Sequence, residues 1–183
     1  MISDCKKNAH EDELKTLKWQ FGLTCQLANY HIPELTDQMC FWEPVPGCWS
    51  VRKSADGRWL PDWSDKEPDP PPVVTIGWLT WHLYWWWSSL LAKVKEEEPV
   101  PRNEVTWSGS AEAVVTELHE LSGKWTEFLD RLNPSDLEKP FEYPWPEPRP
   151  LRIALAWANS ELMKNTAEIG TIHHLYKAIH NRG

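Results

Sequence analysis

Four stretches of the chain repeat hydrophobic residues at spacings of three and four positions, and none of the 16 prolines falls inside them. This spacing places the hydrophobic side chains on one face of a helix, and proline is costly inside a helix. The pattern therefore predicts helices over residues 11–30, 75–95, 110–132 and 151–179. We expect the second helix to end before Glu96, because an acidic run is unfavourable at the C-terminal end of a helix.

A long connection rich in proline and tryptophan separates the first two predicted helices. Residues 32–74 contain eight prolines and four tryptophans. A connection of this length is uncommon in a compact domain unless it is functional or packed on the rest of the fold. The Asp56-Gly57 pair is a turn signal and indicates a short hairpin within it. We predict an all-α four-helix bundle, forming one domain over residues 1–183, with the connection packed over the bundle.

Two of the predicted helices carry polar residues on faces that are otherwise apolar. His82 lies in the middle of the second helix, and Glu161, Asn165 and Glu168 lie on a connected face of the fourth. Glu161 and Asn165 are one turn apart, so their side chains can converge on one point. Such a histidine is either a core residue hydrogen-bonded to a carboxylate or carbonyl, or a ligand of a metal site in the bundle core. Each inward carboxylate would need a basic side chain or a backbone donor as a partner.

The other histidines do not indicate a metal site. His10, His119 and His180 fall on polar faces and are predicted to be surface residues. His173 and His174 are adjacent, so they point about 100° apart on a helix and cannot easily bind one metal ion. The sequence also lacks a phosphate-binding loop, a dinucleotide fingerprint, a zinc-protease motif and a nucleophile elbow.

Charge and composition exclude several classes of protein. The chain has 19 basic and 27 acidic residues, a net charge of -8, which argues against nucleic acid as a partner. No apolar run approaches the roughly 18 residues of a membrane-spanning helix, and the polar N-terminus does not resemble a signal peptide. The four cysteines, Cys5, Cys25, Cys40 and Cys48, show no paired spacing. We therefore expect free thiols and a cytoplasmic location.

The chain has 14 tryptophans, and nine of them lie between Trp42 and Trp87. The adjacent Trp85, Trp86 and Trp87 cover about 200° of a helix and cannot all face one core. At least one must face the connection, a partner subunit or solvent. We expect the tryptophans of the connection to pack beside the second helix, and part of this aromatic surface to form a dimer contact.

Three segments resemble the DinB-like superfamily of four-helix bundle proteins. They are FWEPVPGCWSVR (residues 41–52, with 56–59 and 67–70), TIGWLTWHL (75–83) and NSELMKNTAEIG (159–170). The resemblance covers roughly residues 10–178. It implies an up-down-down-up bundle, often a homodimer, with a divalent metal centre between the second and fourth helices.

The resemblance also implies the metal ligands. The histidine of the family's second helix corresponds to His82, and two further ligands, four residues apart in the fourth helix, correspond to Glu161 and Asn165. These two are both histidine in much of the family, and glutamate and histidine in relatives similar to mycothiol-dependent maleylpyruvate isomerase. Asn165 departs from this pattern, and its amide oxygen is a weaker ligand than imidazole for Ni²⁺, Zn²⁺ or Mn²⁺.

Two functions are consistent with these residues. The first is a thiol-dependent transferase or isomerase, in which a metal at His82 and Glu161 lowers the pKa of a bound small thiol or water. The second is a non-catalytic bundle, either a small-molecule binder or a dimeric interaction protein with a degenerate metal site, and Asn165 favours it. Without a metal, we expect His82 to hydrogen-bond directly to Glu161 or Asn165.

Overall fold

The computed structural model describes residues 2–66 and 68–180, with side chains from residue 8 onward. Its long helices are α1 (Ile2–Ala28), α3 (Ile76–Val94), α4 (Ala111–Arg131) and α5 (Leu151–His180). The shorter elements are α2 (Asp37–Phe41), the hairpin of β1 (Val51–Lys53) and β2 (Trp59–Pro61), the pair of β3 (Pro140–Phe141) and β4 (Arg149–Pro150), and three 3-10 turns, η1 (Ile32–Glu34), η2 (Arg102–Glu104) and η3 (Pro134–Glu138). The predicted all-α class is confirmed.

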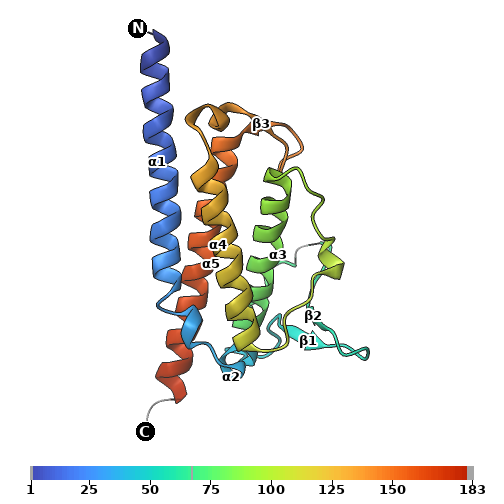
Figure 1. Cartoon of the computed structure of the whole chain (residues 1–183). Helices are drawn as coiled ribbons and strands as arrows, with labels where there is room; N and C mark the ends of the chain where they lie inside the picture. The colour runs from blue at the N-terminus through green and yellow to red at the C-terminus, as the bar shows by residue number, and fades with distance from the viewer. Residues whose placement is uncertain (1, 67, 181–183) are drawn as a thin grey trace.

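The long helices lie side by side, with α1 and α5 running in one direction and α3 and α4 in the other (Figure 1). Helix α5 contacts both α1 and α3, and α3 contacts α4. The N-terminal turns of α1 extend beyond the ends of the other helices (Figure 1). Helix α5 is therefore placed to combine its polar residues with those of α3.

Local sequence explains most helix ends. The Thr75 hydroxyl accepts a hydrogen bond from the Trp78 amide at the start of α3, and Ser110 caps α4 in the same way. Helix α3 ends at Val94, before Glu96, as predicted. The predicted start of the first helix at residue 11 was wrong, since α1 begins at Ile2. The preceding residues contain no glycine or proline to stop a helix, but they lack the apolar stripe that would reveal one.

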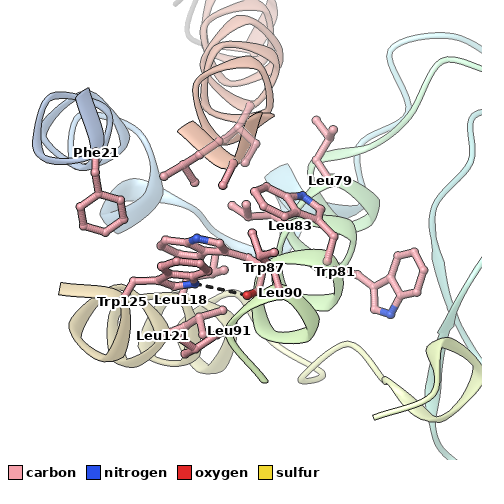
Figure 2. Packing of buried hydrophobic residues seen from close by; sticks show 14 of the residues in the cluster. Phe21, Leu79, Trp81, Leu83, Trp87, Leu90, Leu91, Leu118, Leu121 and Trp125 are labelled. Atoms are coloured by element: carbon pink, nitrogen blue, oxygen red, sulfur yellow. Dashed lines mark hydrogen bonds between the residues drawn. The ribbon is translucent and has the colours of Figure 1, made fainter. Parts of the chain in front are cut away.

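Aromatic side chains occupy the centre of the bundle (Figure 2). The rings of Trp87 from α3 and Trp125 from α4 stack with centroids 6.1 Å apart, and the Trp125 indole donates to the Trp87 carbonyl at 3.2 Å. Phe21 of α1 packs against Trp87 with centroids 6.1 Å apart. These rings therefore join α1, α3 and α4, and buried leucines fill the spaces between them.

The connection between α1 and α3 packs its tryptophans against α3. The rings of Trp49 and Trp63 lie 5.9 Å and 6.5 Å from that of Trp78. Of the three adjacent tryptophans, Trp85 contacts Trp63 of the connection, whereas Trp86 and Trp87 are buried inside the bundle. None of these three rings needs a partner subunit to cover it, and the homodimer stays a prediction.

Gly77 lies where α3 crosses α2 and β1. A Cβ atom at this position would lie 2.9 Å from the Cys40 carbonyl oxygen and 2.9 Å from the Val51 Cγ2 atom. We expect Gly77→Ala to lower the free energy of unfolding by about 2 kcal/mol, because the backbone must move to relieve the overlap. Urea titration would measure the change. Gly123→Ala on α4 is the control, because nothing lies within 4 Å of its Cβ position. Equal effects of the two substitutions would contradict this account.

Candidate functional site

A pocket of about 450 Å³ opens where α3, α5 and the connection meet, and we call it the α3–α5 pocket. Its lining residues are Trp49, Trp63, Ser64, Asp65, Pro71, Pro72, Val74, Trp78, Leu79, His82, Lys164, Asn165 and Glu168. Another pocket, of about 340 Å³, lies between α1 and α4, but its lining includes no carboxylate and is mostly apolar. The α3–α5 pocket is the candidate site because ionisable side chains from two helices converge there.

Backbone pairing places the aromatic wall of the pocket. The Trp49 amide donates to the Val73 carbonyl, and the Thr75 amide donates to the Trp49 carbonyl, both at 2.9 Å. These bonds hold the connection against the first turn of α3. The Trp78 indole then donates to the Asp62 carbonyl at 2.8 Å, which fixes the position of that ring. Sequence reasoning expected the tryptophans of the connection to cover the second helix near His82, but it did not assign Trp49 and Trp78 individually as binding residues.

His82 lies in the pocket wall as a neutral imidazole. Its ring stacks on Trp78, with centroids 4.9 Å apart and an angle of 10° between the planes. Its Nδ1 atom is buried and has no hydrogen-bond partner among the described residues. The pKa of His82 is lowered from 6.5 to about 4, mainly by burial and also by the positive charge of Lys164, while a hydrogen bond of Asn165 opposes the shift. The side chain is therefore uncharged at neutral pH.

Asn165 is buried, with 1% of its surface exposed, and both ends of its amide are engaged. Its Oδ1 atom accepts a hydrogen bond from the Trp86 indole at 3.0 Å, and its Nδ2 atom donates to Glu168 Oε2 at 3.2 Å. An indole nitrogen can only donate, so the amide atom facing Trp86 must be the oxygen. The oxygen that could bind a metal ion thus already uses one of its two lone pairs for Trp86.

Glu161 is not among the lining residues of the pocket. Its Oε2 atom lies 3.4 Å from Lys164 Nζ, in a partly exposed ion pair. The α5 residues that share the pocket with His82 are instead Lys164, Asn165 and Glu168. Lys164 and Glu168 are also four residues apart. They therefore fit the i, i+4 spacing of the two implied ligands as well as Glu161 and Asn165 do. The sequence alone could not choose between these two registers.

This set of side chains does not fit a tightly held metal ion. His82 provides a nitrogen ligand, but the Asn165 oxygen already accepts a hydrogen bond from Trp86, Glu161 pairs with Lys164, and Lys164 adds a positive charge beside the site. Zinc sites normally use three or four good protein ligands. Within residues 2–66 and 68–180, no group of three His, Cys, Asp or Glu side chains is arranged to hold a metal ion. Asn165 bonds to Trp86 and Glu168, and a hydrogen bond from its side chain to His82 raises the pKa of the imidazole, so Asn165 is the partner of His82 among the two that the sequence suggested.

The Trp86–Asn165 hydrogen bond is testable. We expect Asn165→Leu to lower the free energy of unfolding by about 2 kcal/mol, because the buried Trp86 N–H loses its acceptor. Trp86→Phe removes the donor, so the double variant should be less destabilised than the sum of the single variants. Urea unfolding of the three variants measures this coupling. Strictly additive effects would contradict the bond.

The remaining histidines and cysteines lie outside the pocket. His119 and His180 are exposed as predicted, whereas His10 is half-buried. His173 is buried, and its Nδ1 atom lies 3.4 Å from that of His31, at the C-terminal ends of α1 and α5. The cysteines described, Cys25, Cys40 and Cys48, are free thiols, whereas the side chain of Cys5 lies outside the described part. Burial raises the pKa of the Cys40 thiol to about 12, so it is not a reactive thiolate.

Comparison with known proteins identifies the family. In the described part of the chain, no helix combines the length and apolar composition needed to cross a membrane. No curated protein matches the sequence at a significant level. Residues 20–169 match the sequence model of the DinB superfamily. This match spans α3, α4, the connection and most of the pocket-forming part of α5. The chain therefore belongs to the DinB superfamily.

Proposed function

We propose that this DinB superfamily member binds a small organic molecule in the α3–α5 pocket without a tightly held metal ion. The chain of hydrogen bonds from Trp86 through Asn165 to Glu168 carries the proposal. These hydrogen bonds engage the Asn165 amide, which would otherwise be available to a metal ion. They also hold a carboxylate in the wall of an aromatic pocket.

The composition of the pocket supports ligand binding. Pockets for small molecules are mostly apolar, with a few polar groups in fixed positions, and the volume of about 450 Å³ lies in their usual range. Trp78 and Asn165 are both held by hydrogen bonds within the fold. A ligand would therefore meet groups already in place, which reduces the entropy cost of binding.

A metal-dependent transferase or isomerase would need a stronger ligand set. Such chemistry uses the charge of the metal to make a thiolate or hydroxide at neutral pH. Among the described residues that line the pocket, His82 is the only neutral nitrogen ligand, and the Lys164 ammonium is unfavourable for a divalent metal ion beside it. The homodimer and the cytoplasmic location remain predictions, and light scattering would test the homodimer.

NMR of the indole N–H groups would test the proposed function. Single Trp→Phe variants assign the signals of Trp49, Trp63 and Trp78. Small aromatic probes of positive, neutral and negative charge are then titrated at millimolar concentration. We expect at least one probe to shift the signals of these three pocket tryptophans and to leave that of the distant Trp125 unchanged. If no probe shifts the three signals, the proposal is wrong.

A blocking variant supplies the control for this experiment. Ser64 is exposed and lines the pocket, so Ser64→Tyr should narrow it and weaken binding at least about tenfold. Ser135→Tyr introduces the same side chain at an exposed site in η3, away from the pocket, and should have no effect. Equal binding to both variants would place the ligand elsewhere.

A further inference from the structure

The charges around the α3–α5 pocket indicate the class of ligand. We propose that the pocket selects an organic ammonium ion with an apolar body over neutral and anionic molecules of the same shape. This inference rests on the proposed function, because it assigns a chemical class to the ligand of the same site.

Three charged side chains line the pocket, and two of them are paired. Lys164 Nζ lies 3.4 Å from Glu161 Oε2, and Asp65 Oδ1 lies 3.6 Å from Arg102 Nη2. The third, Glu168, accepts a hydrogen bond from the neutral Asn165 amide at 3.2 Å. His82 adds no charge at neutral pH. The pocket therefore presents a carboxylate whose charge is not balanced by a cation in any ion pair of the described residues.

The position of Glu168 reduces the screening of its negative charge by water. The side chain is half-buried, so water screens it less than it would screen a carboxylate on an open surface. Its hydrogen bond to the buried Asn165 restricts the carboxylate to the pocket wall. A ligand cation would therefore find a fixed partner, whereas a ligand anion would be repelled.

The tryptophan wall favours the same ligand. The face of an indole ring carries negative electrostatic potential and attracts organic cations, Trp being the most effective aromatic residue. The protein already uses this interaction at the edge of the pocket. The Arg102 guanidinium carbon lies 4.2 Å from the centre of the Trp63 ring, and Arg102 also pairs with Asp65. Glu168 and the ring of Trp49 offer a second combination of carboxylate and aromatic surface, without an internal cation.

Lys164 is the feature that opposes a bound cation, and its variant provides an independent test. Its side chain is more exposed than that of Glu161, at 55% against 28%, and the two form an i, i+3 pair on α5. Solvent and Glu161 thus reduce its effect on the pocket. Removing the lysine charge should strengthen cation binding, whereas it should weaken binding if an anion is the true ligand.

Three probes of nearly equal shape distinguish the ligand classes: phenethylammonium, phenethyl alcohol and phenylacetate. Each is titrated into the full chain, and the indole signals of Trp49, Trp63 and Trp78 report binding. We expect phenethylammonium to bind at least about tenfold more tightly than the alcohol, and phenylacetate to bind most weakly. Tighter binding of the alcohol or of phenylacetate would overturn the ammonium preference and leave the proposed function intact. Failure of all three probes to bind would overturn both.

Variants assign the preference to Glu168. Glu168→Gln keeps an acceptor for Asn165 but removes the charge, so it should reduce the preference for phenethylammonium over the alcohol to within about twofold. Glu127→Gln makes the same charge change on the exposed face of α4 and should leave the preference unchanged. Lys164→Gln should increase the affinity for phenethylammonium. If Glu168→Gln and Glu127→Gln behave alike, or if Lys164→Gln weakens binding, the inference is wrong.

Discussion

Acidification from pH 7 to pH 4 is expected to lower the free energy of unfolding by about 3 kcal/mol through His82 alone. The pKa of His82 is about 4 in the folded protein and 6.5 in the unfolded chain, and one pKa unit corresponds to about 1.4 kcal/mol. The unfolded chain binds the proton more readily, so the stabilisation is complete above pH 6.5. It is lost as the pH falls from 6.5 towards 4.

His82→Gln isolates this effect, because glutamine does not titrate. The pKa values of His31 and His173 are also lowered by burial and act in the same direction, so the difference between wild type and variant is the relevant quantity. Urea unfolding at several pH values should give a pH dependence that is weaker by about 3 kcal/mol in the variant. An NMR titration that finds the His82 imidazole protonated near pH 6.5 would contradict its burial in the neutral form.

Lys164→His is expected to create a site for Ni²⁺ or Zn²⁺ that binds more tightly than any site of the wild-type protein. The substitution removes a positive charge and adds a second imidazole one turn from Glu168, facing the same pocket as His82. Three protein ligands are then available, as in catalytic zinc sites. At a free metal concentration about 100 times Kd, binding would stabilise the variant by about 2.7 kcal/mol. Thermal unfolding with and without metal measures the shift.

Two further variants control this experiment. Lys164→Gln removes the same charge without adding a ligand, and it should show no comparable stabilisation. Asn165→His adds an imidazole at the position that the family resemblance suggested, but it also breaks the bond to Trp86 and should bind metal poorly. If Asn165→His binds metal and Lys164→His does not, the ligand register inferred from the pocket is wrong.

Local signals in the sequence were sufficient for most of the helices. The absence of proline together with three- and four-residue spacing predicted both ends of α3, α4 and α5 to within one residue, because both signals act within a few turns. The start of α1 was missed because its first turns are mostly polar. The short α2 was missed because a helix of five residues is too short to show a period.

The candidate site was only partly predictable for a related reason. A polar residue in an apolar helix stands out in a sequence, and His82, Asn165 and Glu168 were identified in this way. The direction in which a side chain points depends on how one helix rotates against another. The rotation of α5 brings Lys164 and Glu168 to the pocket together with Asn165, and it leaves Glu161 outside.

The sequence by itself determined the helical class, the resemblance to the DinB superfamily and the choice of His82 as a candidate site residue, because these depend on residue type and short-range spacing. Only the tertiary structure decided which groups the Asn165 amide hydrogen-bonds to. Its neighbour Trp86 is 79 positions away in the chain, and their hydrogen bond forms only when α3 and α5 pack together. The same packing joins the tryptophans of the connection to Glu168 in one pocket. Long-range contacts thus turn an expected metal position into an aromatic pocket with an unbalanced carboxylate.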